Sequence, residues 1–191
     1  MVFIFITNKI GGYNGLKERY SNTKYNFMKR IYRFLNKGLQ YETNSYLPLD
    51  LNIKGPVNFL HGISGIFISG SATVGRNCTI YQQVTIGSNM LIDSKGFGSP
   101  TIGDNCLIGA GAKIIGNVSI GDNCRIGANA VVSTNLPANS VVVMSVPKIY
   151  QKENLINHIH QYSSQGWGYY KDGAFVLEED KDVLLKLESY L

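Results

Sequence analysis

The sequence has few charged residues, few histidines and no long apolar run, and each shortage excludes a class of protein. Charged residues make up 16% of the 191 positions and aromatic residues 11%, whereas disordered chains combine high charge with few aromatics. No apolar run approaches the roughly 18 residues that span a bilayer. The opening segment Met1–Ile6 is too short for the core of a signal peptide. We therefore expect a folded, soluble, cytoplasmic protein of one domain with appendages.

Positive charge is concentrated near the N-terminus. Residues 1–60 hold nine Lys or Arg and three Asp or Glu, whereas residues 151–191 hold four and seven. The segment Lys17–Lys37 interleaves its basic residues with aromatic and aliphatic ones. This pattern suits a helix that packs its apolar residues and solvates its charges, or a surface helix attracted to an anionic lipid or polymer. The first interpretation is favoured. No nucleic-acid recognition motif is present, so we expect no nucleic-acid partner and no membrane span.

An aliphatic residue recurs every six positions through the middle of the chain. Neither an α-helix nor a plain strand keeps a period of six. A solenoid does, because each short strand and turn places one aliphatic side chain into a shared interior. The repeat occupies Ile68, Val74, Ile80, Ile86 and Ile92, and after a gap of ten it resumes at Ile102, Ile108, Ile114, Ile120, Ile126 and Val132.

Two local features accompany the repeat. The triplets Gly75-Arg76-Asn77, 103–105 and 121–123 supply Gly and Asn, which tolerate positive φ at the corners of a coil. The gap between Ile92 and Ile102 indicates four extra residues within 93–100. Such an insertion forms either a surface bulge or part of a functional site.

On these motifs the sequence resembles the hexapeptide-repeat acetyltransferases, whose fold is a left-handed parallel β-helix of triangular section. It is similar to serine acetyltransferase and, more closely, to the related polysaccharide and capsule O-acetyltransferases. The segments that carry the resemblance are Leu60–Ile66, Tyr81–Gly87, Ile108–Asn117, Ile126–Val132 and Leu136–Pro147.

The resemblance implies a mainly β fold with helical ends. We expect a helical or irregular segment at 1–56, the β-helix at 57–150 and a helical extension at 151–191 with two helices around residues 165–170. Three hexapeptides make one 18-residue coil in this family, so Cys106 and Cys124 should stack inside the helix as small apolar fillers. A disulfide or a metal site is disfavoured because no Cys-x-x-Cys or Cys/His spacing is present.

Histidine is scarce, and His61 is the one that lies at the predicted β-helix. A neutral imidazole can accept a hydroxyl proton near pH 7, although a lone His is more often structural. The resemblance favours catalysis, with His61 as the general base while the acceptor hydroxyl attacks the acetyl-CoA thioester directly. His158 and His160 are expected in a polar, solvent-facing helix.

The resemblance also implies how acetyl-CoA, the co-substrate, is held. Ala110 and Ala128 match positions where the family's backbone lines the pantetheine groove, and small side chains allow that approach. Ser133 and Lys148 match positions near the nucleotide end, where a cation would neutralise phosphate. The resemblance further implies that the protein is a homotrimer with active sites between neighbouring subunits. We expect no metal ion in the site.

Three departures from serine acetyltransferase bear on the acceptor. The second active-site His of those enzymes falls on Ser99, and their helping Asp falls on Tyr46, which leaves Asp50 as a nearby candidate to orient His61. A glycine of the terminal motif is replaced by Ser145. The first two departures put L-serine in doubt as the acceptor.

We therefore expect an acetyl-CoA-dependent O-acetyltransferase that acts on a hydroxyl of a sugar or polysaccharide precursor. The alternatives are serine O-acetylation, N-acetylation of a nucleotide-linked amino sugar, and a non-catalytic trimeric scaffold. A zinc-dependent carbonic anhydrase on the same helix would need three His ligands, which a single His at the β-helix does not supply.

Overall fold

The computed structural model describes residues 1–145, 149–151, 153 and 157–189. The chain divides into two compact units, Met1–Val146 and Pro147–Leu191. Each unit is described by itself. No helix in the described part of the chain is long and apolar enough to cross a membrane.

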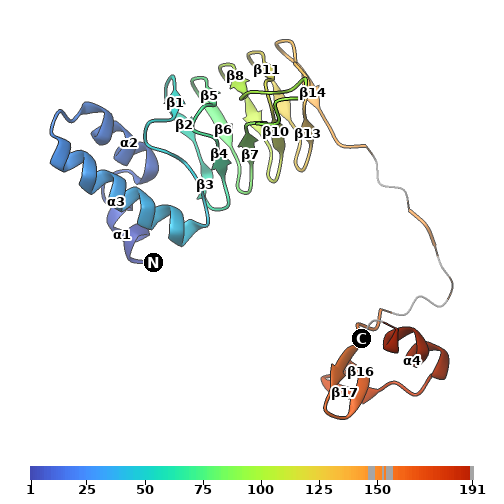
Figure 1. Ribbon diagram of the computed structural model, residues 1–191. Coiled ribbons are helices and arrows are strands. Elements are labelled where there is room, and N and C mark those ends of the chain that lie inside the picture. Colours follow the sequence, from blue (N-terminus) through green and yellow to red (C-terminus); the bar gives the residue numbers. More distant parts are fainter. Residues whose placement is uncertain (146–148, 152, 154–156, 190–191) are drawn as a thin grey trace. The chain divides into compact units, whose positions relative to one another are not determined.

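The first unit begins with the helices α1 (Val2–Asn8), α2 (Gly12–Asn22) and α3 (Asn26–Thr43). They lie at one end of the strands that follow (Figure 1). Leu16 and Leu39 belong to the same buried cluster as the first strands, so the helices close that end of the core. Helix α3 ends at Asn44 with φ of 48°, a left-handed conformation that Asn tolerates. The prediction of a helical N-terminal segment is confirmed.

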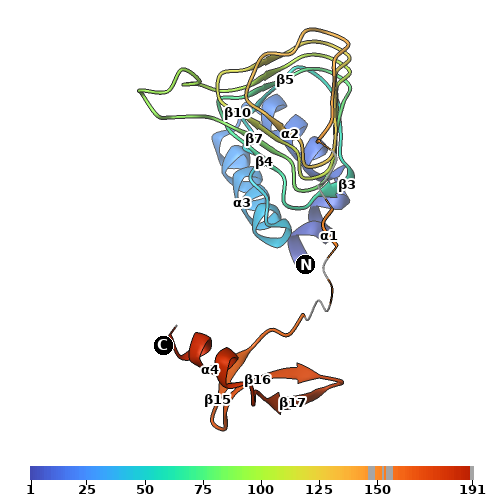
Figure 2. The same cartoon turned by 90° about the vertical axis from the view of Figure 1, so that its right-hand side faces the viewer.

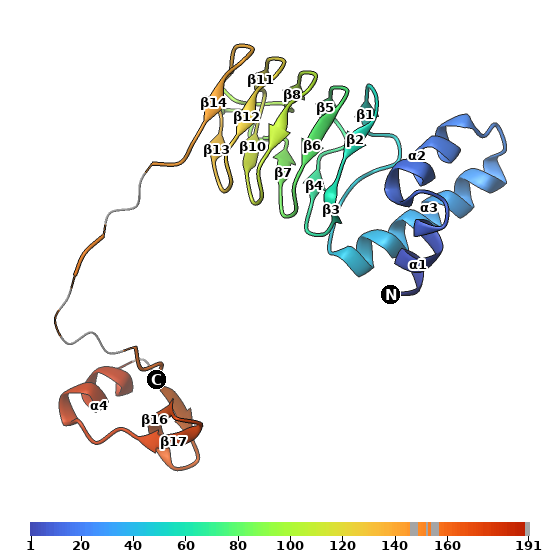
Figure 3. The ribbon, with the colours of Figure 1, turned by 180° about the vertical axis from the view of Figure 1, so that it is seen from behind.

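The strands of the first unit form three parallel ladders. Figure 2 looks along the coils and shows their triangular outline, and Figure 3 shows the ladders from behind. The first ladder is β1 (Asn52–Ile53), β5 (Thr73–Val74), β8 (Thr101–Ile102) and β11 (Ser119–Ile120). The second is β4 (Phe67–Ile68), β7 (Thr85–Gly87), β10 (Lys113–Ile115) and β13 (Val131–Val132). The third is β2 (Val57–Asn58), β6 (Cys78–Ile80), β9 (Leu107–Ile108), β12 (Arg125–Ile126) and β14 (Val141–Val142).

The six-residue repeat fills the interior of this parallel β-helix, as predicted. Its aliphatic residues other than Ile92 are buried. The three cysteines are buried and free, and each thiol donates to a carbonyl oxygen of the next coil, as Cys106 Sγ does to Gly121 O at 3.2 Å. The cysteines are therefore interior fillers, and the prediction for Cys106 and Cys124 is confirmed.

The expected role of Ile92 is wrong, and so is the expected length of the insertion. Val74 pairs with Ile102, 28 residues on, so the insertion adds ten residues to an 18-residue coil rather than four. Ile92 is 91% exposed. Asn89 and Gly98 exchange two backbone hydrogen bonds at 2.8 Å, and the loop between them projects from the β-helix (Figure 2). The loop pairs with itself, so its aliphatic residue never reaches the core.

Asn and Gly serve different purposes at the corners of the coils. Asn77, Asn105 and Asn123 adopt φ of 55°, 58° and 58°, so Asn rather than Gly takes the left-handed positions of the triplets. Gly103 serves close approach instead, because a Cβ there would lie 2.4 Å from Asp122 Oδ1 in the next coil. A side chain at position 103 would therefore hold the two coils farther apart than the usual strand spacing.

The second unit corrects the prediction of two helices at 151–191. The segment around residues 165–170 forms an antiparallel sheet of β15 (Gln161–Ser163), β16 (Gly166–Lys171) and β17 (Ala174–Leu177). Aromatic and β-branched residues favour strands, and Asp172 and Gly173 turn the chain at positive φ. One predicted helix is present as α4 (Lys181–Glu188), whose N-terminus is capped by the Asp180 side chain.

His158 and His160 are also placed differently from the prediction of a polar helix. Neither lies in a helix. The ring of His158 stacks on Tyr169 with centroids 3.6 Å apart, and His160 Nε2 lies 2.6 Å from Glu178 Oε2. His160 is partly buried as a result, because the sheet brings Glu178 across to it.

Candidate active site

His61 lies where the chain enters the β-helix. It belongs to β3 (Leu60–Ile63), which follows β2. Ile63 is buried and His61 is exposed, so the strand is anchored by one side chain while the imidazole faces outward. Gly62 between them has φ of 70°, a conformation that an L side chain rarely adopts.

The imidazole of His61 is held by Gln82. Its Nδ1 lies 2.7 Å from Gln82 Oε1, and Tyr81 meets the ring edge-on with centroids 5.4 Å apart. An amide oxygen can only accept, so Nδ1 carries a proton, and in the neutral ring the lone pair is on Nε2. This tautomer suits a general base. The expected role of Asp50 is not supported, because the side chain that contacts His61 is Gln82.

Gln82, Ala110 and Ala128 stack along one corner of the β-helix. The N–H of Gly111 donates to Gln82 O at 3.0 Å, and the N–H of Asn129 donates to Ala110 O at 2.8 Å. Ala110 is half-buried and Ala128 is exposed. We call this row of three residues, with His61 at its N-terminal end, the catalytic corner. Its small side chains leave the backbone open to a long, thin ligand.

Of the two residues expected at the nucleotide end, the structure describes Ser133. Ser133 is exposed and follows β13, one side of the triangle beyond Ala128. Lys148 lies outside the residues that the structure describes. The structure therefore brings His61, Ala110 and Ala128 together, and Ser133 stands apart from them.

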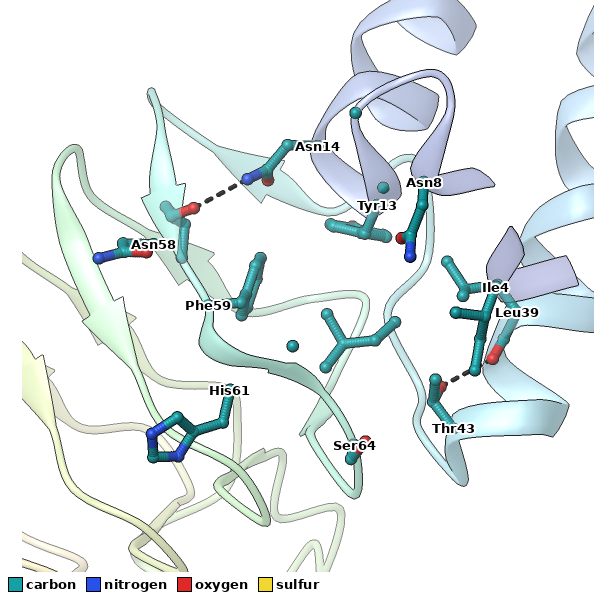
Figure 4. Close-up of a pocket in the computed structure, with 15 residues that line it drawn as sticks. Ile4, Asn8, Tyr13, Asn14, Leu39, Thr43, Asn58, Phe59, His61 and Ser64 are labelled. Atoms are coloured by element: carbon teal, nitrogen blue, oxygen red, sulfur yellow. Dashed lines mark hydrogen bonds between the residues drawn. The ribbon is translucent and has the colours of Figure 1, made fainter. Parts of the chain in front are cut away.

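A hollow of about 440 Å³ lies between the N-terminal helices and the strands β2 and β3. Asn8, Asn14 and Asn58 contribute polar atoms to its wall and Phe59 an aromatic ring. His61 lies at its edge, but its ring is directed away from the interior in Figure 4 and toward Gln82. The candidate chemistry therefore belongs to the catalytic corner rather than to this hollow.

Ser99 and Tyr46, which stand at positions of family active-site residues, are engaged elsewhere. Ser99 Oγ lies 2.7 Å from Ser88 Oγ at the base of the inserted loop. The ring of Tyr46 stacks on Phe67 with centroids 5.0 Å apart. Neither residue supplies a carboxylate or an imidazole, so His61 relies on Gln82 for its orientation.

The structure offers no activated thiol beside His61. Cys78, Cys106 and Cys124 are all buried inside the coils, whereas reactive cysteines are at least partly exposed. Among the described residues no three His, Cys, Asp or Glu side chains gather as they would around a metal ion. The geometry therefore fits base-assisted attack by a bound hydroxyl.

Sequence reasoning missed Gln82. The residue lies within Tyr81–Gly87, a segment that carries the family resemblance. It also precedes Ala110 by 28 residues, the spacing of two coils separated by the insertion. The signal could be read only with the correct length of the insertion, which the pairing of Val74 with Ile102 supplies.

Comparison with known proteins shows similarity to hexapeptide-repeat transferases and serine acetyltransferases. Residues 99–134 match the family described as "Bacterial transferase hexapeptide (six repeats)". Serine acetyltransferases of Staphylococcus epidermidis and Staphylococcus aureus are each 48% identical over 99 residues, or 52% of this chain and 40% of theirs. The chain thus spans about 40% of the length of the curated relatives it matches.

Solved structures of serine acetyltransferases share the fold. Isoform 3 from Entamoeba histolytica, in complex with cysteine, has a TM-score of 0.58 at 33% identity, covering 74% of this chain and 49% of that one. The Neisseria gonorrhoeae enzyme, in complex with serine, has a TM-score of 0.56 at 27% identity, covering 76% and 55%. The prediction of a left-handed parallel β-helix is confirmed by these neighbours together with the repeat match.

Proposed function

We propose that the chain, which matches the hexapeptide-repeat transferase model and resembles serine acetyltransferases of left-handed β-helix fold, transfers an acetyl group from acetyl-CoA to a hydroxyl. The observation that carries the proposal is the catalytic corner. There His61 is fixed by Gln82 at 2.7 Å, and the open backbone at Ala110 and Ala128 continues the same edge. The proposal thus assigns the base and the thioester to one edge of the β-helix.

The proposed reaction needs no acyl-enzyme. Nε2 of His61 takes the proton of the acceptor hydroxyl while the hydroxyl oxygen bonds to the thioester carbonyl carbon. The carbon–sulfur bond then breaks and CoA leaves as its thiolate. His61 passes the proton that it took from the hydroxyl to that sulfur. Gln82 holds the Nδ1–H throughout and so keeps Nε2 directed at the hydroxyl.

Two acceptors merit direct comparison. The relatives are named serine acetyltransferases, which makes L-serine the first acceptor to test. A sugar or polysaccharide-precursor hydroxyl is the second, because Ser99 and Tyr46 stand where the family resemblance implies a second active-site His and a helping Asp. A panel of L-serine, sugars and nucleotide-linked amino sugars, read by release of free CoA, ranks them.

Assembly and location are parts of the same proposal. We propose a homotrimer in which the inserted loop Asn89–Gly98 of one subunit approaches the catalytic corner of the next. Trimers mixed from a His61→Ala subunit and a loop-shortened subunit would then regain activity, and failure to complement would refute shared sites. A cytoplasmic location fits the three free cysteines, since disulfides are rare where thiols are kept reduced.

The proposal is tested by His61→Ala, with His158→Ala as the matched control outside the β-helix. General-base catalysis contributes roughly 10²- to 10⁴-fold, so His61→Ala should lower kcat by that range. His158→Ala should leave kcat unchanged. Calorimetry should show acetyl-CoA bound equally by all three proteins. Unchanged turnover in His61→Ala contradicts the mechanism, and absence of acetyl-CoA binding by the unmodified protein favours a non-catalytic scaffold.

A further inference from the structure

Helix α3 carries two apolar stripes, and the fold uses only one of them. The inward stripe includes Leu39, which is buried, and Tyr32 and Leu35, which pack against the core. The outward stripe holds Phe27, Phe34 and Tyr41, which are 72%, 65% and 90% exposed. These three recur every seven residues, and successive seventh residues lie on one face of an α-helix. The outward stripe therefore has no role in forming the core of the described chain.

Basic residues interleave with the outward aromatics. Arg30 and Lys37 are exposed and follow Phe27 and Phe34 at a spacing of three. The sequence of the stripe is thus aromatic, basic, aromatic, basic, aromatic from Phe27 to Tyr41. At a rise of 1.5 Å per residue the stripe is about 21 Å long.

Helix α1 extends this surface. The ring of Phe3 meets Phe34 edge-on with centroids 5.6 Å apart and so joins the two helices. Val2, Phe5 and Ile6 are exposed, and the ammonium of Lys9 lies 4.5 Å from the Phe5 ring centroid. We call a set of exposed residues from α1, its C-cap Lys9 and α3 the aromatic–basic face. It comprises Val2, Phe5, Ile6, Lys9, Phe27, Arg30, Phe34, Lys37 and Tyr41.

The charge of the aromatic–basic face selects an anionic partner. The acidic residue of α1 and α3 is Glu42, and its carboxylate is occupied by the backbone N–H groups of Phe3 and Ile4 at 3.1 and 2.8 Å. A second copy docked through the same face would place cations against cations. Self-association through this face is therefore disfavoured.

We propose that the aromatic–basic face binds the surface of a membrane with anionic lipid headgroups. Exposed Phe, Val and Ile gain free energy at the boundary between headgroups and acyl chains, whereas they gain little from a nucleic-acid phosphate backbone. Arg30, Lys37 and Lys9 can reach the headgroups while their stems cover apolar surface. This binding places the enzyme at a lipid surface and is independent of the proposed acetyl transfer.

The experiment is vesicle co-sedimentation of the full chain at 50 mM salt. Vesicles of phosphatidylcholine and phosphatidylglycerol in equal parts are compared with vesicles of phosphatidylcholine alone. The protein should sediment with the anionic vesicles and not with the neutral ones, and 500 mM salt should weaken binding through screening. Equal binding to both vesicles, or binding to neither, overturns the proposal.

Variants separate this face from general charge. Each cation near an anionic surface contributes about 1 kcal/mol, so Arg30→Gln with Lys37→Gln should lower the partition coefficient about 30-fold. Lys171→Gln with Lys181→Gln changes the net charge equally on exposed residues of the second unit and should change it less than twofold. Phe27→Ser should lower it about tenfold.

Two further outcomes count against the proposal. Equal losses in the two double variants would show that net charge rather than this face drives binding. A change in subunit number of Phe27→Ser, measured by analytical ultracentrifugation, would assign the face to a second copy. Circular dichroism of each variant confirms that the helices remain folded, and Tyr41→Ser offers a second aromatic probe at a 90% exposed position.

Discussion

The hydrogen bond between Gln82 and His61 supports a quantitative prediction about catalysis. Replacing Gln82 with Met keeps the length of the side chain and removes the amide that accepts from Nδ1–H. The 2.7 Å contact joins two side chains at the surface, and a typical hydrogen bond contributes about 1 kcal/mol. We therefore expect kcat/KM to fall about fivefold, because the imidazole samples orientations and a tautomer that do not present Nε2 to the hydroxyl.

The assay follows release of free CoA from acetyl-CoA with the best acceptor of the panel. Gln83→Met is the matched control, because Gln83 occupies the same turn while the side chain that contacts His61 is Gln82. It should leave kcat/KM within twofold. Circular dichroism of both variants checks that the coils are intact.

A second measurement tests whether the two residues act as one unit. In a His61→Ala background there is no imidazole to orient, so Gln82→Met should cost nothing further. An equal fivefold loss in both backgrounds would show that Gln82 acts by another route, such as contact with a substrate. Equal losses from Gln82→Met and Gln83→Met would likewise refute the positioning role.

Two further predictions concern the scaffold. Gly109→Ala would place a Cβ 2.7 Å from Ala128 N and 2.9 Å from Ile126 O, so we expect a loss of about 2 kcal/mol and a fall in Tm of about 4–8 °C. Gly70→Ala, which meets only a side-chain atom at 3.7 Å, should leave Tm unchanged by thermal denaturation. For Glu42, desolvation acts upward, but the N–H groups of Ile4 and Phe3 and the ammonium of Met1, 3.1 Å from Oε1, lower its pKa to about 2 from an ordinary 4.5. Its contribution is therefore complete above pH 4.5 and lost as the pH falls toward 2, so Glu42→Gln should lower Tm at pH 6 and not at pH 2.

The regular coils could be predicted from the sequence because the repeat and the burial are the same physical fact. Each aliphatic residue of the six-residue repeat fills one side of a coil. Ile102, Ile108 and Ile114 therefore predict three successive strands. Cys106 and Cys124 follow the same logic. Ile92 shows the limit of the repeat as a predictor. The six-residue spacing does not tell whether the backbone around Ile92 pairs with the next coil or within its own loop.

The C-terminal segment shows a different limit. Helix α4 is amphipathic and capped by Asp180, so its sequence carries local evidence for a helix. Tyr169 and Tyr170 become strand residues through pairing with Val176 and Phe175 across a turn, and Trp167 through pairing with Tyr162. That pairing involves contacts between segments rather than local preference, and a short aromatic run is compatible with either structure.

The sequence by itself determined the solenoid, and through the family resemblance it singled out His61, Ala110 and Ala128 as candidate site residues. Each of these follows from residues that recur or from motifs that hold their spacing. The tertiary structure alone decided that Gln82 holds His61, that the insertion is ten residues long, and that the aromatic residues of α3 face outward. Those features depend on which distant segments meet, and stacking of coils brings together residues 21 or 28 positions apart that no local pattern connects.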